Sequence, residues 1–169
     1  GVSSVPYGKV DGVEIANDCS QYAGAPACLN QAEINAAYAV PSPFSMQLTH
    51  WFNAANDSIF INCEITCTQN VTMTTPKVRV ALIEKAITLT SPPAGSNGET
   101  VFYNVMREMY PHGNGTALAG TWTSGQKKVV SFKEKIPTYI YNKPQLAVVA
   151  WVQDDSNKNV KQSAFSSSP

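Results

Sequence analysis

Charge is scarce in this sequence. Only 14% of its 169 residues are charged, and 12 basic residues balance 12 acidic ones to a formal net charge of zero. An average soluble domain has about 25% charged residues. Nucleic-acid phosphates are bound by clustered Lys and Arg, so no nucleic-acid partner is expected. The densest basic stretches, Lys127 with Lys128 and Lys133 with Lys135, fit the solvated face of a strand.

Long apolar runs and histidines are also missing. No run of roughly eighteen apolar residues occurs, so no transmembrane segment is expected. The two histidines, His50 and His112, are accompanied by no nucleophile-elbow motif, and a Ser-His-Asp site needs three groups within hydrogen-bonding reach. We therefore expect both histidines to be surface or turn residues, and we expect no enzyme.

The cysteines are four, and an even number favours disulfides and an extracellular compartment. Residues 59–67 alternate strictly, with Cys63 and Cys67 on one face. In one straight strand their Cα atoms lie about 13 Å apart at 3.3 Å per residue, whereas a disulfide needs about 7 Å or less. Unless the strand bends between them, we expect each to pair with Cys19 or Cys28.

Metal ligands are sparse. Zinc sites need closely spaced ligand pairs, and Cys19 and Cys28 are too far apart for that pattern. Asp154, Asp155 and Asn157 form an oxygen-rich turn that would suit calcium, which prefers such ligands. The alternative is an ordinary polar hairpin turn. No other cofactor is expected.

Of the three tryptophans, one is expected to be buried and another to be exposed. Trp151 lies in an apolar stretch and is expected in the core. Trp122 lies among glycines and threonines in the irregular stretch 111–125, so we expect it to be exposed. An exposed Trp122 would be able to stack on a sugar ring.

From residue 44 onward the hydrophobic period is two, with turns between the alternating stretches. Strands are expected at 44–48, 59–67, 77–87, 101–110, 129–136, 146–153 and 160–165. This pattern predicts a mainly β fold, an antiparallel Ig-like or jelly-roll-type β-sandwich with one short N-terminal helix. The helix begins after Asn30, which forms a capping box with Glu33, and ends near Tyr38 before two prolines.

The expected organisation is one domain over residues 13–169, preceded by an extended arm over 1–12. Within the domain, 13–43 hold the disulfide loop and helix, and 44–169 form the sandwich. The arm has these apolar and turn-forming residues: Val2, Val5, Pro6, Tyr7 and Val10. Such an arm would add a strand to a neighbour, which predicts a self-assembling structural subunit, either a filament or a surface layer. The alternative is a monomeric adhesive or glycan-binding module that uses Trp122.

A family resemblance covers roughly residues 75–165. It rests on VALIE (80–84), Asn97-Gly98, VFYNVMR (101–107), GTAL (115–118), WTSG (122–125), LAVVAWVQDD (146–155) and VKQSA (160–164). Together these segments resemble the Omp28-related outer-membrane proteins of Bacteroidetes-type bacteria. The resemblance implies a C-terminal β-sandwich at the outer-membrane surface or outside the cell. Its partners would be further copies or other surface proteins.

The family resemblance bears on two further points. Members often carry a thioredoxin-like domain before the sandwich, and residues 1–12 look like the last strand of one. Because no Cys-x-x-Cys motif is present, redox activity is not carried over. Glycosylation is a separate expectation, with Asn-x-Ser/Thr sequons at Asn56, Asn70 and Asn114 and a Bacteroidetes-type O-glycosylation motif at Ser58.

Overall fold

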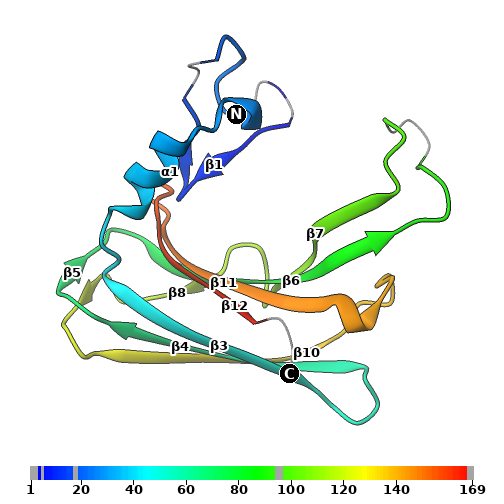
Figure 1. Cartoon of the computed structure of the whole chain (residues 1–169). Helices are drawn as coiled ribbons and strands as arrows, with labels where there is room; N and C mark the ends of the chain where they lie inside the picture. Colours follow the sequence, from blue (N-terminus) through cyan, green and yellow to red (C-terminus); the bar gives the residue numbers. More distant parts are fainter. Residues whose placement is uncertain (1–3, 5, 17–18, 94–96, 167–169) are drawn as a thin grey trace.

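The period-two alternation of the sequence builds two large antiparallel sheets in the computed structural model (Figure 1). The structure describes residues 4, 6–16, 19–93 and 97–166. One sheet has the strand order β10 (Lys127–Lys135), β4 (Ser58–Cys67), β3 (Phe44–Phe52). The other has the order β12 (Val160–Ser166), β11 (Leu146–Asp154), β6 (Pro76–Thr88), β7 (Val101–Tyr110), and β8 (Thr116–Ala117) pairs with the start of β6.

The core lies between these two sheets. Every second residue of β4, from Ile59 to Cys67, is buried against the inward residues of β6 and β11. Val80 and Val148, for example, are fully buried there. Burying one such aliphatic side chain contributes about 1.5–3 kcal/mol, so the inward-facing side chains of these strands together stabilise the sandwich. The predicted fold class is confirmed.

The predicted strands all occur, and the stretch 111–125 adds two short ones. One is β8, and the other is β9 (Thr121–Trp122), which pairs with β5 (Val71–Thr72). The nearly apolar β11 lies between β12 and β6, as a central strand should.

Two expected positions are wrong. His50 is not a surface residue, because β3 turns it toward the interior, where its Nδ1 lies 2.8 Å from Ser166 Oγ. Burial lowers the pKa of His50, and the charge of Lys85 adds to this effect. Trp151 is not in the core between the sheets, because the alternation of β11 places it on the outer face with Val149.

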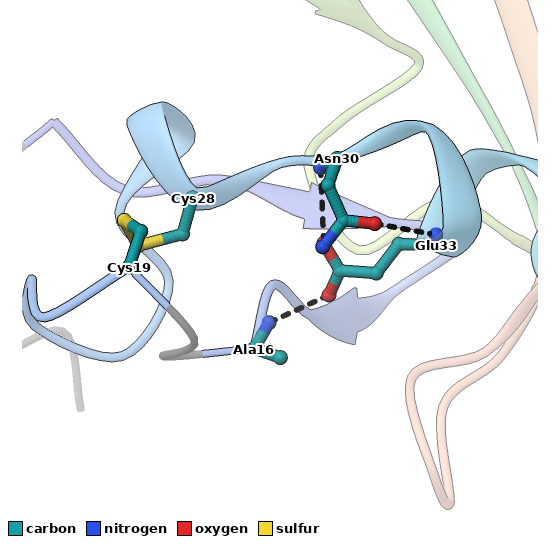
Figure 2. Close-up of a disulfide and its surroundings, with 5 residues drawn as sticks. All are labelled: Ala16, Cys19, Cys28, Asn30 and Glu33. Atoms are coloured by element: carbon teal, nitrogen blue, oxygen red, sulfur yellow. Dashed lines mark hydrogen bonds between the residues drawn. A yellow bond between two sulfur atoms is a disulfide. The ribbon is translucent and has the colours of Figure 1, made fainter.

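The N-terminal unit packs beside the sandwich (Figure 1). It holds the hairpin β1 (Lys9–Val10)–β2 (Val13–Glu14), a 3-10 turn (Pro26–Cys28) and α1 (Gln31–Tyr38). The predicted capping box is present: Asn30 accepts from the Glu33 backbone N–H at 3.0 Å, and Glu33 accepts from the Asn30 N–H at 3.3 Å (Figure 2). Within the described residues, no helix is long and apolar enough to cross a membrane.

The prediction of a free extended arm over residues 1–12 is wrong for the part of it that the structure describes. Lys9–Val10 pairs with the next strand of its own chain rather than standing free. The Gly8 N–H donates to Gly24 O at 2.7 Å, and Tyr7 donates to Glu14. Val10 packs on the small N-terminal cluster and lines a groove of about 950 Å³ between the hairpin, α1 and β12. Tyr22 donates to the carbonyl of Pro6, whereas Val2 and Val5 lie outside the described residues.

Candidate interaction edge

The cysteines pair differently from the prediction. Cys19 and Cys28 form a disulfide with each other, with Cα atoms 5.2 Å apart (Figure 2). Cys63 and Cys67 are free and buried. Cys63 and Cys67 do not bond to each other, because they lie too far apart along a straight strand. Neither of them pairs with Cys19 or Cys28 in the N-terminal loop. Their face of β4 is the core face, which the N-terminal loop cannot enter.

The buried thiols should therefore be unreactive in the folded protein. Burial raises the pKa of the Cys63 thiol to about 11, and the thiolate is the reactive form. With a thiol-specific colorimetric reagent at pH 8, we expect almost no reaction until urea unfolds the chain, and then two thiols per chain. If no thiol appears after unfolding, the four cysteines form two disulfides and the pairing described above is wrong.

Trp122 is not exposed. It is 2% exposed, its indole N–H donates to Ala119 O at 2.6 Å, and its ring packs edge-on against Phe44 at 5.3 Å. The glycines around it let the loop fold over the end of the sandwich, so the indole closes the core. A sugar cannot stack on Trp122 in this arrangement.

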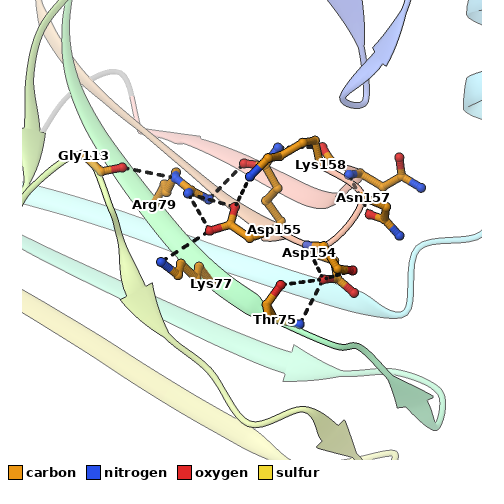
Figure 3. A network of polar contacts seen from close by, with 11 residues as sticks. Thr75, Lys77, Arg79, Gly113, Asp154, Asp155, Asn157 and Lys158 are labelled. Atoms are coloured by element: carbon orange, nitrogen blue, oxygen red, sulfur yellow. Dashed lines mark hydrogen bonds and ion pairs between the residues drawn. The ribbon is translucent and has the colours of Figure 1, made fainter.

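The turn proposed for calcium is occupied by the protein's own donors (Figure 3). Asp154 accepts from the backbone N–H groups of Thr74 at 2.9 Å and Thr75 at 3.0 Å, and from the Ser156 hydroxyl at 2.8 Å. Burial would raise the pKa of Asp154, but these donors outweigh it and hold the pKa well below its ordinary value. A carboxylate surrounded by N–H and O–H donors ties two turns together and has no oxygen directed at a cation.

The neighbouring residues take part in a surface network rather than a metal site. Asp155 forms ion pairs with Arg79 at 2.9 Å and with Lys77 at 3.3 Å, and Arg79 holds the pKa of Asp155 below its ordinary value (Figure 3). Asn157 accepts from the Asn159 N–H. Across the described ranges, no three His, Cys, Asp or Glu side chains gather where they would hold a metal.

The glycosylation candidates differ in exposure and in whether their side chains are hydrogen-bonded. Asn56 and Asn114 are exposed in turns. Asn70 is exposed, but its side chain accepts from the Ser124 N–H at 2.9 Å. Ser58 is half-buried at the start of β4 and donates to Asp57 at 2.8 Å. Asn56 and Asn114 are therefore the two most accessible of the four.

The two large sheets have four edge strands among the described residues, and three of these edges are protected. Edge strands expose unpaired backbone groups, and lysines or neighbouring segments guard against pairing with another chain. β3 and β12 lie along each other, and Gln162 of β12 donates to Phe44 O of β3 at 2.8 Å. β10 has lysines at these positions: Lys127, Lys128, Lys133 and Lys135.

The fourth edge, β7, is open. Its sequence holds no lysine and no proline, and several of its apolar side chains are exposed, including Tyr103 (72%) and Met106 (59%). No hydrogen bond from another described segment reaches the outward backbone groups of residues 101–106. We call residues 101–106 the open edge. In Figure 1, this end of β7 projects beyond the rest of the sandwich with the end of β6.

A cluster of tyrosines borders the open edge. The Arg107 guanidinium lies 5.0 Å from the ring of Tyr139 and 5.5 Å from the ring of Tyr141, and both tyrosines are exposed. Tyr139 donates to Arg107 O at 2.8 Å, which closes the edge at that residue. Tyr and Arg are the side chains that most often dominate binding at protein interfaces.

A buried carboxylate holds this cluster in place. Glu84 is 0% exposed; its Oε2 lies 3.1 Å from Arg107 Nε, and its Oε1 accepts from the Asn142 N–H at 2.7 Å. Glu84 thus connects β6, β7 and the segment that leads into β11. No role was assigned to Glu84 from the sequence, and the edge was not found. One partial signal was present, since 101–110 lacks the lysines that 127–135 has, but only the strand order makes 101–110 an edge.

Comparisons with known proteins agree with this architecture. The family described as "Outer membrane protein Omp28" matches residues 1–168. A domain of the outer membrane lipoprotein Omp28 from Porphyromonas gingivalis is 13% identical, with a TM-score of 0.50 over 76% of this chain and 91% of that one. HBP35 of the same organism is 11% identical, with a TM-score of 0.59 over 82% of this chain and 45% of that one. No functionally curated protein matches the sequence.

Proposed function

We propose that this chain, which belongs to the outer membrane protein Omp28 family, is a non-enzymatic surface module. We propose further that it pairs with a second copy of itself through the open edge. The family and the outer-membrane location are those expected from the sequence. The strand addition that the sequence assigned to the N-terminal arm is assigned here to β7. No catalytic group is required for this role.

The observation that supports the proposal is the difference between β7 and the other edges. Residues 101–106 pair with β6 on one side and form an edge of six residues on the other, which is about the length of an average strand. Strand addition uses backbone hydrogen bonds for affinity, and side chains beside the edge add specificity. Tyr103, Met106 and the tyrosine cluster lie where such side chains are needed.

A second copy is the partner that the sequence favours. Two identical antiparallel edges pair about a two-fold axis, which is the commonest symmetry of soluble oligomers. The formal net charge of zero removes the long-range repulsion that keeps like chains apart. Because the other edges are protected, pairing at β7 gives a closed dimer rather than the filament that the sequence suggested.

The dimer is tested by particle mass. Sedimentation equilibrium or light scattering should give twice the 18.2 kDa chain mass for the unmodified protein. Tyr103→Lys and Met106→Lys, combined in one chain, should raise the dimer dissociation constant at least tenfold, because lysines on an edge strand oppose pairing. The thermal midpoint of the variant at low concentration should stay near that of the monomeric protein.

The matched control lies on a protected edge. Val129 of β10 is also an exposed apolar residue on an edge strand, so Val129→Lys should leave the dimer intact. A monomer for the unmodified protein at high micromolar concentration contradicts the proposal. Equal dissociation by Val129→Lys also contradicts it, because the effect would then not depend on β7.

A further inference from the structure

The outer face of the three-stranded sheet carries a second distinctive surface. The outward residues of β3, β4 and β10 align in cross-strand rows. One row is Trp51, Phe60 and Lys133, and the next is Thr49, Asn62 and Ser131. This face lies on the opposite sheet from β7, so it is separate from the open edge.

The first row is a stack that ends in an available ring. Trp51 and Phe60 are parallel within 3°, with ring centroids 5.4 Å apart, and Lys133 Nζ lies 5.5 Å from the Phe60 centroid. Trp51 stacks on the Phe60 ring, and the Lys133 ammonium group lies over the same ring. The stacking on Phe60 fixes the plane of the Trp51 indole. Trp51 is 47% exposed, and no further aromatic or cationic group of the described residues stacks on it. It is a rigid, solvent-facing aromatic surface on an edge strand.

The second row supplies neutral hydrogen-bonding groups beside the ring. Ser131 donates to the Asn62 side-chain oxygen at 2.8 Å, which fixes the amide and leaves its two N–H donors directed elsewhere. Thr49 is exposed next to them and adds a hydroxyl. Glu64, one row further along β4, is paired with Lys127 at 2.8 Å, so its charge is compensated, and Lys133 is the cation of the first row.

From this juxtaposition we propose that the face formed by Trp51, Asn62, Thr49 and Ser131 binds a neutral glycan. A pyranose ring has an apolar C–H face, which packs on an indole, and a rim of hydroxyls, which both donate and accept. Residues i and i+2 of a strand are about 6.6–6.8 Å apart, so a sugar on Trp51 places its neighbour beside Thr49 on the same strand, with Asn62 on the adjacent strand. Trp51, Asn62, Thr49 and Ser131 themselves carry no charge, which fits an uncharged glycan.

The test uses the full chain and defined sugars. Cellohexaose, laminarihexaose and mannohexaose are titrated by calorimetry, with heparin as an anionic comparison. At least one neutral hexasaccharide should bind, and Trp51→Ala and Asn62→Ala should each weaken it tenfold or more. Trp51→Phe keeps an aromatic ring on Phe60 and should retain part of the affinity. Phe165→Ala, which removes an exposed aromatic from the other sheet, should bind as the unmodified protein does.

Fluorescence provides a readout that does not depend on folding of the alanine variant. Trp122 is buried and Trp151 lies on the outer face of the other sheet, so bound sugar should protect only Trp51 from acrylamide quenching, and this protection should vanish in Trp51→Phe. The proposal is overturned if no neutral hexasaccharide binds at millimolar concentration, or if Trp51→Ala binds undiminished. Binding of heparin alone, weakened by salt, would assign the face to its lysines instead and would also overturn it.

Discussion

Replacing Glu84 with alanine should lower the free energy of unfolding by about 3–5 kcal/mol, because one partner of a buried ion pair is removed. Glu84 is fully buried between Arg107 Nε and the Asn142 N–H. Its loss leaves the Arg107 charge without a carboxylate and a backbone donor without an acceptor. Urea denaturation followed by far-ultraviolet circular dichroism measures the change.

The control for Glu84 is an exposed ion pair in the same molecule. Glu64 and Lys127 lie on the solvent face with a similar N–O distance of 2.8 Å, and Glu64→Ala should cost less than about 1 kcal/mol. Glu84→Leu combined with Arg107→Met should recover much of the loss, since apolar replacements of similar volume are often tolerated. A cost for Glu84→Ala no larger than that for Glu64→Ala would show that the pair is solvated.

The second large effect is expected at Asp154. Asp154→Asn should cost roughly 2–4 kcal/mol at pH 7, because hydrogen bonds to a charged acceptor contribute about 1.5–3 kcal/mol and the new amide N–H group faces donors. Asp154 is buried and accepts from both Thr74 and Thr75, so the change loosens the turn before β6. Asp11→Asn, at an exposed carboxylate, should change the free energy of unfolding by less than about 0.5 kcal/mol.

The effect of Asp154→Asn should depend on pH in one direction. The pKa of Asp154 in the folded protein is lowered, whereas an unfolded Asp has a pKa of about 3.9. Its contribution is therefore complete above about pH 5 and is lost as the pH falls below about 4. The difference in unfolding free energy between the two proteins should shrink between about pH 5 and 2. Asp155, whose pKa is also lowered, is present in both proteins and cancels. A difference that stays constant with pH contradicts this account.

The strands and the helix were predictable from the sequence because their signals are local. Period-two alternation located most of the long strands, β-branched and aromatic residues indicated the strand at 101–110, and a nearly apolar run indicated the one at 146–153. The Asn30–Glu33 capping box located the start of α1. Each signal involves residues a few positions apart, so one chain is enough to read it.

The partners of the cysteines and of Trp122 were not predictable in the same way. Alternation assigns Cys63 and Cys67 to one face of β4, but only the packing of the second sheet makes that face the interior. Trp122 lies among glycines, which suggested exposure, yet the loop folds back so that the indole meets Phe44. The open edge likewise depends on strand order, which alternation does not contain.

The lysines of β10 have a consequence for the number of neighbours that one chain can take. A sheet protein with two unguarded edges has a valence of two, and its copies add without end. In the dimer proposed above, the four lysines on β10 and the packing of β3 against β12 would leave this chain a valence of one. On a crowded cell surface, a valence of one would stop growth at a pair and would leave the outer face of the three-stranded sheet uncovered in both copies.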